Sequence, residues 1–152
     1  MGVGYGLTDK QMLTLASQDD ADRLVGLLCS AATQIGLKAH VWTPGNLPRL
    51  VNWMREQCQA HRAWMVCEDG ALLGMLILKE NEDGILYVVV AKAARRRGVG
   101  SILIRHVQQS RASLCAEARN EPSRRMLQRY GFQDTGKVSP SGHPLLSWRR
   151  CT

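Results

Sequence analysis

Residues 85–107 read ILYVVVAKAARRRGVGSILIRHV and contain three different kinds of sequence in succession. The first six residues are apolar and mostly β-branched, which predicts a strand that is buried on both faces. A short basic linker follows and ends at Gly100, and an amphipathic helix is predicted to begin at about Ser101. The stretch therefore predicts a strand, a glycine-containing turn and a helix.

The turn has the properties of an anion-binding site. N–H groups in the first turn of a helix have no helical acceptor, and the helix dipole places partial positive charge there. Gly98 and Gly100 carry no side chain, so an anion can approach the backbone closely. Arg95, Arg96 and Arg97 add donors that match phosphate oxygens. We interpret this turn as a cradle for a diphosphate.

Two common phosphate-binding motifs are absent. The P-loop requires Gly-Lys-Ser/Thr, and the dinucleotide fingerprint requires a third glycine where this chain has Leu103. The pattern present, Arg95-x-x-Gly98-x-Gly100 after a valine-rich strand, resembles the Q/R-x-x-G-x-G/A loop of the GNAT acyltransferase superfamily. In that superfamily the loop binds the diphosphate of acetyl-CoA. The alternative for this pattern alone is a solvated basic cap on a helix that packs beside a core strand.

A second motif supports the resemblance. Residues 120–132, NEPSRRMLQRYGF, are similar to the GNAT pattern N-x-x-A/S-x-x-x-Y/L-x-x-x-G-F. The same residues also describe a well-capped helix, because Asn120 is a good N-cap, Pro122 suits the first turn and Gly131 suits the C′ position. A capped helix alone does not explain the spacing of this motif from the first one.

The remaining elements follow from periodicity and turn signals. Asp69-Gly70 lies between two apolar runs, as in a tight β-hairpin. Strands are predicted at 12–16, 63–68, 71–79, 85–90, 113–116, 132–138 and 145–149, and helices at about 19–35, 47–59, from 101, and 120–130. This order resembles the GNAT fold: an α/β (α+β) fold with a central, mixed, mostly antiparallel splayed sheet of about six to seven strands, flanked by about four helices. We expect a single domain over residues 1–152, with residues 1–10 loose.

Composition limits the classes of function. The formal net charge is +7, but the basic residues cluster at 95–97 and 119–129 without interleaved aromatic side chains, which favours a polyanionic cofactor over nucleic acid. No apolar run approaches the length of a membrane span, and no signal peptide is evident. The five cysteines are scattered and show no metal-binding spacing. We therefore expect a cytoplasmic protein that uses no metal and binds neither nucleic acid nor a membrane. A homodimer is compatible with the sequence.

The resemblance implies a reaction and a set of binding residues. The implied activity is direct transfer of an acetyl group from acetyl-CoA to a primary amine, of a small molecule or a protein, in a ternary complex. The strand at 85–90 and the strand at 113–116 would splay apart and leave a gap between them for the pantetheine arm. The implied cofactor-binding residues are Val88, Val89 and Val90 on the strand, Arg95, Arg96, Arg97, Gly98, Val99, Gly100 and Ser101 in the cradle, and Asn120 and Ser123 along the arm.

The catalytic residues are less clearly encoded. Many GNAT members carry a Tyr, seven residues after the motif's Asn, that protonates the leaving thiolate, and Leu127 occupies that position here. Ser123 resembles the serine of the branch that acetylates ribosomal-protein N-termini, and Tyr130 is a second candidate for the acid. Glu117 is the first candidate for the general base, with water-mediated deprotonation as an equal alternative.

Two other functions compete with catalysis. A non-catalytic module that binds acyl-CoA and reports it to a partner would explain the missing Tyr and the lack of an acidic residue in the strand at 85–90. A basic nucleic-acid binder is supported by charge alone. In the expected fold, His40, Trp42 and Trp53 would flank the acceptor site, although ordinary packing explains the same residues.

Overall fold

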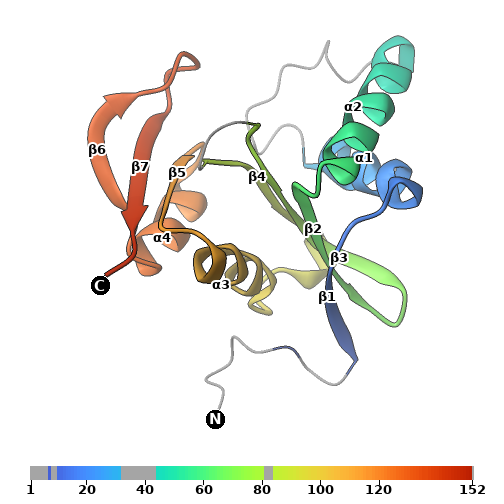
Figure 1. Ribbon diagram of the computed structural model, residues 1–152, viewed down its shortest axis with the longest axis horizontal. Coiled ribbons are helices and arrows are strands. Elements are labelled where there is room, and N and C mark those ends of the chain that lie inside the picture. The colour runs from blue at the N-terminus through green and yellow to red at the C-terminus, as the bar shows by residue number, and fades with distance from the viewer. Residues whose placement is uncertain (1–6, 8–9, 32–43, 81–83, 152) are drawn as a thin grey trace.

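The computed structural model describes residues 7, 10–31, 44–80 and 84–151, and it contains one central sheet with helices on both sides (Figure 1). The strands are β1 (Gln11–Leu15), β2 (Ala63–Glu68), β3 (Ala71–Leu78), β4 (Gly84–Val90), β5 (Ser113–Glu117), β6 (Gln133–Val138) and β7 (Pro144–Arg149). They are arranged in the order β1-β2-β3-β4-β5-β7-β6. Among these strands, β4 and β5 alone run parallel, and all other neighbours are antiparallel. The predicted fold class is confirmed.

Four α-helices cover the sheet. They are α1 (Ala21–Ser30), α2 (Leu47–Gln59), α3 (Val99–Ser110) and α4 (Glu121–Arg129). The predicted Asp69-Gly70 hairpin turn has left-handed φ values at both residues, 51° and 84°. The predicted continuation of the first helix to residue 35, and the candidate aromatic pocket at His40 and Trp42, lie outside the described residues.

The sheet separates two hydrophobic clusters. Successive residues of a strand point to opposite faces, so Val89 belongs to the cluster under α1 and α2 while Val88 contacts the cluster under α3. Leu24 and Met54 are fully buried on the first side, and Leu103 is fully buried on the second. Strand β4 is therefore covered on both faces, as its near-continuous apolar sequence predicts.

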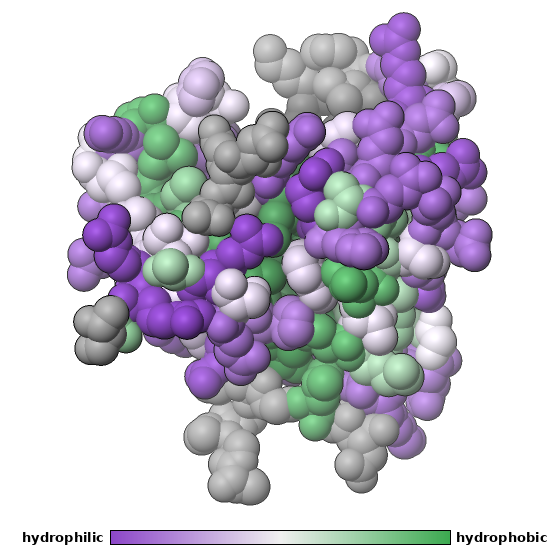
Figure 2. Space-filling model, in the orientation of Figure 1, coloured by the Kyte–Doolittle hydropathy of each residue, from purple (hydrophilic) through white to green (hydrophobic). Residues whose placement is uncertain are grey.

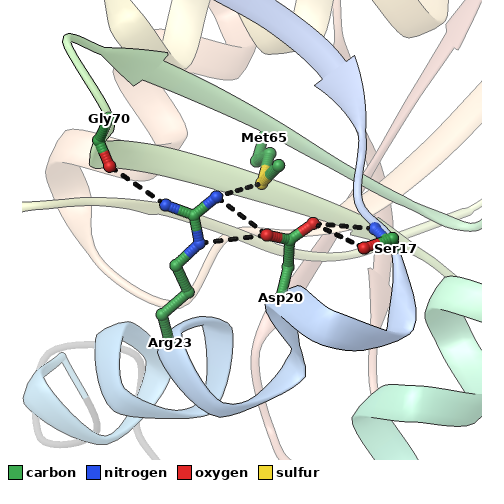
Figure 3. Close-up of polar contacts among 5 residues, drawn as sticks. All are labelled: Ser17, Asp20, Arg23, Met65 and Gly70. Atoms are coloured by element: carbon green, nitrogen blue, oxygen red, sulfur yellow. Dashed lines mark hydrogen bonds and ion pairs between the residues drawn. The ribbon is translucent and has the colours of Figure 1, made fainter.

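The start of α1 is held by a cluster that we call the latch, formed by Ser17, Asp20, Arg23 and Gly70 (Figure 3). The Asp20 carboxylate accepts hydrogen bonds from the backbone and side chain of Ser17 at 2.8 and 3.2 Å. It also accepts two from the Arg23 guanidinium, at 3.1 and 2.8 Å. Arg23 in turn donates to the carbonyl of Gly70 at 3.1 Å, which joins the first helix to the β2–β3 hairpin.

The surface agrees with a globular domain. Figure 2 shows hydrophilic residues over most of the visible face, with apolar residues visible between them towards its middle. No helix in the described segments is long and apolar enough to cross a membrane. The five cysteines are free, and burial raises the pKa of the Cys58 thiol to about 11, with Asp20 adding to the effect.

Candidate active site

Strands β4 and β5 pair where the start of β4 lies beside Cys115 and Ala116 of β5, and they then diverge. In the described chain, their pairing is limited to Gly84 and Ile85 of β4. The next carbonyl, that of Leu86, accepts a hydrogen bond from Nη1 of Arg119 at 3.1 Å, so a side chain occupies the place of the neighbouring strand. We call this point the fork, and it is formed by Leu86, Tyr87, Glu117 and Arg119.

Beyond the fork, no strand of the described residues pairs with one edge of β4. Alternate residues of a strand direct their N–H and C=O groups to opposite edges. The Leu86 carbonyl points to the fork, whereas the N–H of Ala91 bonds the carbonyl of Leu73 on β3. Val88 and Val90 therefore present their backbone groups to the open edge, where an extended ligand could pair with them.

A cavity of about 750 Å³ lies along this edge. Its walls come from β4, from the turn before α3, from the first turn of α3 and from one side of α4, with Ala31 after α1. All the residues predicted to bind the cofactor line it, with the exception of Arg97. Residues that sequence reasoning missed also line it, and they are Ala31, Ala94, Pro122, Arg125, Met126 and Arg129.

The turn at the end of the cavity is shaped by left-handed backbone. Arg96 and Gly98 have φ values of 67° and 78°. Gly98 is the N-cap of α3, which begins at Val99, two residues before the predicted start. Gly100 and Ser101 therefore lie in the first helical turn. The first hydrogen bond of the helix is donated by the N–H of Ile102 to the carbonyl of Gly98, at 3.0 Å. The N–H groups before Ile102 have no helical acceptor and can bind an anion.

Gly100 leaves little room for a side chain. A Cβ at this position would lie 2.9 Å from Sδ of Met126 and 3.5 Å from a methyl of Val90. Both neighbours line the cavity. The glycine thus allows α3 and α4 to approach each other where the cavity begins, and this role differs from the close approach of a ligand to naked backbone that the sequence suggested.

The three arginines of the cradle do not act alike. Arg95 and Arg96 line the cavity. Arg97 is instead paired with Glu68 of β2, with Nη2 and Oε1 2.7 Å apart. Two of the three cradle arginines therefore line the cavity, and the third connects the turn to β2.

The start of α4 lies opposite the cradle. The Asn120 side chain accepts a hydrogen bond from the N–H of Ser123 at 2.8 Å, so it caps the helix as predicted from its residue type. The Ser123 side chain lines the large cavity and also a second, smaller one. This serine therefore lies at the junction of two hollows.

The second hollow, which we call the notch, has a volume of about 40 Å³ and lies in the fork. Val88, Ser123 and Met126 line both the notch and the large cavity. Glu117 and Arg119 complete the notch wall, and both side chains are largely buried. The notch and the cavity thus meet at one place, as two substrates of one reaction require.

The notch contains a buried charge pair. Nε of Arg119 lies 3.4 Å from Oε2 of Glu117, and this buried oxygen makes no hydrogen bond in the described residues. The Arg119 guanidinium also lies over the ring of Tyr87, 4.7 Å from its centroid. Burial raises the pKa of the Tyr87 hydroxyl, Arg119 opposes this and Glu117 adds to it, so the hydroxyl is protonated at neutral pH.

Other candidates lie elsewhere. Tyr130 packs against the α3-side core and lines a separate surface hollow with Arg105 and Arg150, so it is not brought together with Ser123 and Glu117. Leu127 is buried and lines the notch at the place where many GNAT members carry Tyr. Trp53 packs edge-on against Tyr87. No group of three potential metal-ligating side chains occurs within the part of the chain that the structure describes.

Comparisons with known proteins concern the family and the fold. The model of the acetyltransferase (GNAT) family matches residues 22–132. A GNAT-family acetyltransferase from Bacillus cereus is 22% identical with a TM-score of 0.69, covering 93% of this chain and 99% of that chain. An N-acetyltransferase from Staphylococcus aureus is 18% identical with a TM-score of 0.72, covering 91% and 98%. The PaiA N-acetyltransferase from Thermoplasma acidophilum, solved in complex with coenzyme A, is 12% identical with a TM-score of 0.67, covering 92% and 99%. These likenesses show the fold. No curated protein matches the sequence significantly.

Proposed function

Since the chain belongs to the acetyltransferase (GNAT) family, we propose that it transfers an acetyl group from acetyl-CoA to the nitrogen of a primary amine. The observation that carries this proposal is the meeting of the large cavity and the notch at Ser123. The first hollow has the size and cationic character that a long anionic thioester requires. The second offers a carboxylate to an amine. The acceptor is a small molecule or a protein amine.

The residues of the cavity fit acetyl-CoA. Arg95, Arg96 and the free N–H groups at the start of α3 would hold the diphosphate. The open edge at Val88 and Val90 would pair with the amide groups of the pantetheine arm. Asn120 would act mainly by fixing α4, because its side chain already caps that helix.

Acetyl-CoA supplies an activated acyl thioester, and the protein's residues supply position and proton handling. The amine nitrogen forms a bond to the thioester carbonyl carbon, the carbon–sulfur bond breaks, and the electron pair leaves on the thiolate sulfur. A backbone N–H of the open β4 edge would stabilise negative charge that develops on the carbonyl oxygen. The proton lost by the amine goes to Glu117, directly or through water, and the thiolate takes up a proton from Ser123 or from water.

A primary amine is the acceptor class that fits the notch best. Glu117 places a carboxylate oxygen without a hydrogen bond inside a hollow of about 40 Å³, and an amine N–H is the natural donor for it. A related fold offers one precedent. N-acetylglutamate synthase from Neisseria gonorrhoeae, solved with coenzyme A and N-acetyl-glutamate, is 18% identical, and this chain covers 35% of that chain.

One observation favours a non-catalytic acyl-CoA sensor as the second candidate. Leu127 is buried in the notch wall where a proton-donating Tyr is common in the family. In that case the cavity would bind acyl-CoA tightly and the notch would accept no amine. The sensor would form a stable complex with a partner protein.

Turnover on a broad amine and peptide panel separates the two candidates. Purified protein should bind acetyl-CoA in calorimetry and release coenzyme A thiol with at least one amine. Tight binding without turnover on any amine would favour the sensor. An absence of both heat and thermal protection with millimolar acetyl-CoA would overturn both candidates.

A further inference from the structure

Arg119 joins three groups across the fork. Its Nη1 donates to the Leu86 carbonyl at 3.1 Å, its Nε lies 3.4 Å from Oε2 of Glu117, and its guanidinium stacks on the Tyr87 ring. Two of these groups lie on β4 and one ends β5. The arginine therefore connects the two strands just beyond the point where their backbone pairing stops.

The charge pair in the fork is not a fully hydrogen-bonded one. Arg119 directs a hydrogen bond to a carbonyl of β4, while Oε2 of Glu117 keeps its hydrogen-bonding capacity although it is buried. A buried carboxylate oxygen that is ion-paired but not hydrogen-bonded has unused acceptor capacity. Such a site is therefore poised to accept a hydrogen bond from a ligand that enters the notch.

We propose that Arg119 is a positioning residue of the acceptor notch, and that it fixes the Glu117 carboxylate so that Oε2 accepts an N–H of an unhindered primary amine. The inference rests on the proposed function and names the acceptor class more closely. Arg119 acts through Glu117 and through the width of the fork.

The volume of the notch limits the acceptor. About 40 Å³ holds only a few water molecules, because one water needs roughly 10–15 Å³ of such space. An amino group on an unbranched carbon fits this space, whereas a branched carbon next to nitrogen would contact Leu127 or Met126, which line it. The acceptor is therefore an amine of the ethylamine or lysine side-chain type.

Arg23 provides a matched control, because its interactions have the same types as those of Arg119. It pairs with a carboxylate and donates to a backbone carbonyl, at Gly70. It lines neither the cavity nor the notch. Arg23→Met therefore removes a comparable set of contacts in a place remote from the proposed chemistry.

The test measures three quantities in Arg119→Met, Arg119→Lys and Arg23→Met: the acetyl-CoA dissociation constant, kcat and KM for ethylamine, and the urea midpoint. We expect Arg119→Met to keep the acetyl-CoA dissociation constant and to lose about 30-fold in kcat/KM for ethylamine, because the carboxylate is no longer oriented. Arg119→Lys should recover part of this loss. Arg23→Met should lower the urea midpoint and leave kcat/KM unchanged.

If Arg119→Met weakens acetyl-CoA binding as strongly as it lowers kcat/KM, or if Arg119→Lys recovers nothing, Arg119 is a structural connection only and the proposal is wrong.

A binding measurement keeps this test separate from the proposed function. With coenzyme A at saturation, ethylamine should raise the melting temperature of the unaltered protein, and tert-butylamine should not. Arg119→Met should abolish the difference between the two amines. A protein that binds ethylamine in this selective way but turns over no amine would contradict the proposed catalysis and support the inference. Equal shifts with both amines, or none with either, would overturn the inference even where turnover is found.

Discussion

The latch and the fork each contain one arginine, one carboxylate and one backbone carbonyl, yet they differ in how completely these groups are bonded. In the latch, the Asp20 carboxylate accepts four hydrogen bonds, two from Ser17 and two from Arg23. In the fork, Arg119 lies close to Glu117, but Oε2 of that carboxylate has no hydrogen bond. Both oxygens of the latch carboxylate are hydrogen-bonded, whereas Oε2 of the fork carboxylate can still accept a hydrogen bond from a ligand.

This difference follows from where the two clusters lie in the sheet. The latch joins α1 to a hairpin whose strands pair from Ala63 to Glu68, so both oxygens of Asp20 and the Gly70 carbonyl have partners nearby. The fork lies where parallel pairing stops after two residues, and no strand among the described segments bonds the rest of this β4 edge. Complete bonding favours stability, and incomplete bonding at a buried place favours function.

The comparison is tested most strongly by Glu117→Gln. The amide has the shape of the carboxylate but cannot take up the amine's proton, so we expect kcat to fall about 100-fold or more. The free energy of unfolding should fall as well, because the neutral amide leaves the largely buried Arg119 guanidinium without its charge partner. Steady-state kinetics and urea unfolding of the same samples measure both effects.

The control for Glu117→Gln is Asp20→Asn in the latch. It should also lower the free energy of unfolding, but it should leave kcat unchanged. If both variants lost stability equally and neither lost activity, the fork would stabilise the fold, as the latch does, and would have no role in catalysis.

A second test concerns the cavity beside the fork. In Gly100→Ala, the new Cβ would lie 2.9 Å from Sδ of Met126, and this side chain must move within the wall that the cavity and notch share. Overpacking of this kind is unfavourable by about 1–3 kcal/mol. We expect the free energy of unfolding to fall by this amount. We also expect acetyl-CoA to bind about tenfold more weakly in calorimetry, because the displaced Met126 side chain would narrow the cavity. Unchanged affinity would mean that acetyl-CoA does not contact this wall.

Local sequence signals predicted the fold because each strand, turn and cap is specified by neighbouring residues. The β-branched run of β4, the Asp69-Gly70 turn and the Asn120 cap can all be read without knowledge of distant contacts. The cradle and Ser123 were predicted from motifs with fixed spacing. The structure places Arg95, Arg96, Gly98 and Ser123 around one cavity.

The contacts that were missed join residues that are far apart in the chain. Arg119 bonds a carbonyl 33 positions away, and its position depends on how soon β4 and β5 diverge, which no local pattern encodes. Arg97 pairs with Glu68 across 29 positions for the same reason. The nearest sequence signal was the position of Arg119 directly before the motif that begins at Asn120.

The third test removes the latch carboxylate. Asp20→Ala eliminates the bonds to Ser17 and leaves Arg23 with Gly70 alone among its oxygen acceptors, so we expect the free energy of unfolding to fall by about 1–2 kcal/mol. The catalytic efficiency should not change, because no latch residue lines the cavity or the notch. Urea unfolding and initial-rate assays check both statements. A loss of activity that exceeds the loss of folded protein would show that the two clusters are coupled.

The fourth test compares two helical glycines, Gly26 and Gly100, whose helices α1 and α3 cover opposite faces of the sheet. Gly26 lies in α1, and a Cβ there would meet nothing within 4 Å, in contrast to Gly100. Gly26→Ala should therefore stabilise the protein by about 0.5–1 kcal/mol through helix propensity. Acetyl-CoA affinity should stay the same. A weaker affinity in Gly26→Ala would indicate that binding responds to any change in helix stability, and Gly100→Ala would then lose its meaning as a test of contact.

The smallest expected effect is the pH dependence of the latch. Burial raises the pKa of the Asp20 carboxyl, but hydrogen bonds from Ser17 and Arg23 outweigh it, so the pKa lies below its ordinary value of 3.8. A lowered pKa in the folded state means that the ionised group stabilises the protein above the ordinary pKa, and that this stabilisation is lost as the pH falls through the folded value. The difference in unfolding free energy between the unaltered protein and Asp20→Asn should thus be constant near neutral pH and become smaller below about pH 4.

Urea titrations at a series of pH values measure this difference, and the contributions of all other carboxyl groups cancel because both proteins contain them. A difference that stays constant down to pH 3 would mean that the latch holds a neutral acid as firmly as an anion, and the contrast with the fork would then rest on hydrogen-bond geometry rather than on charge.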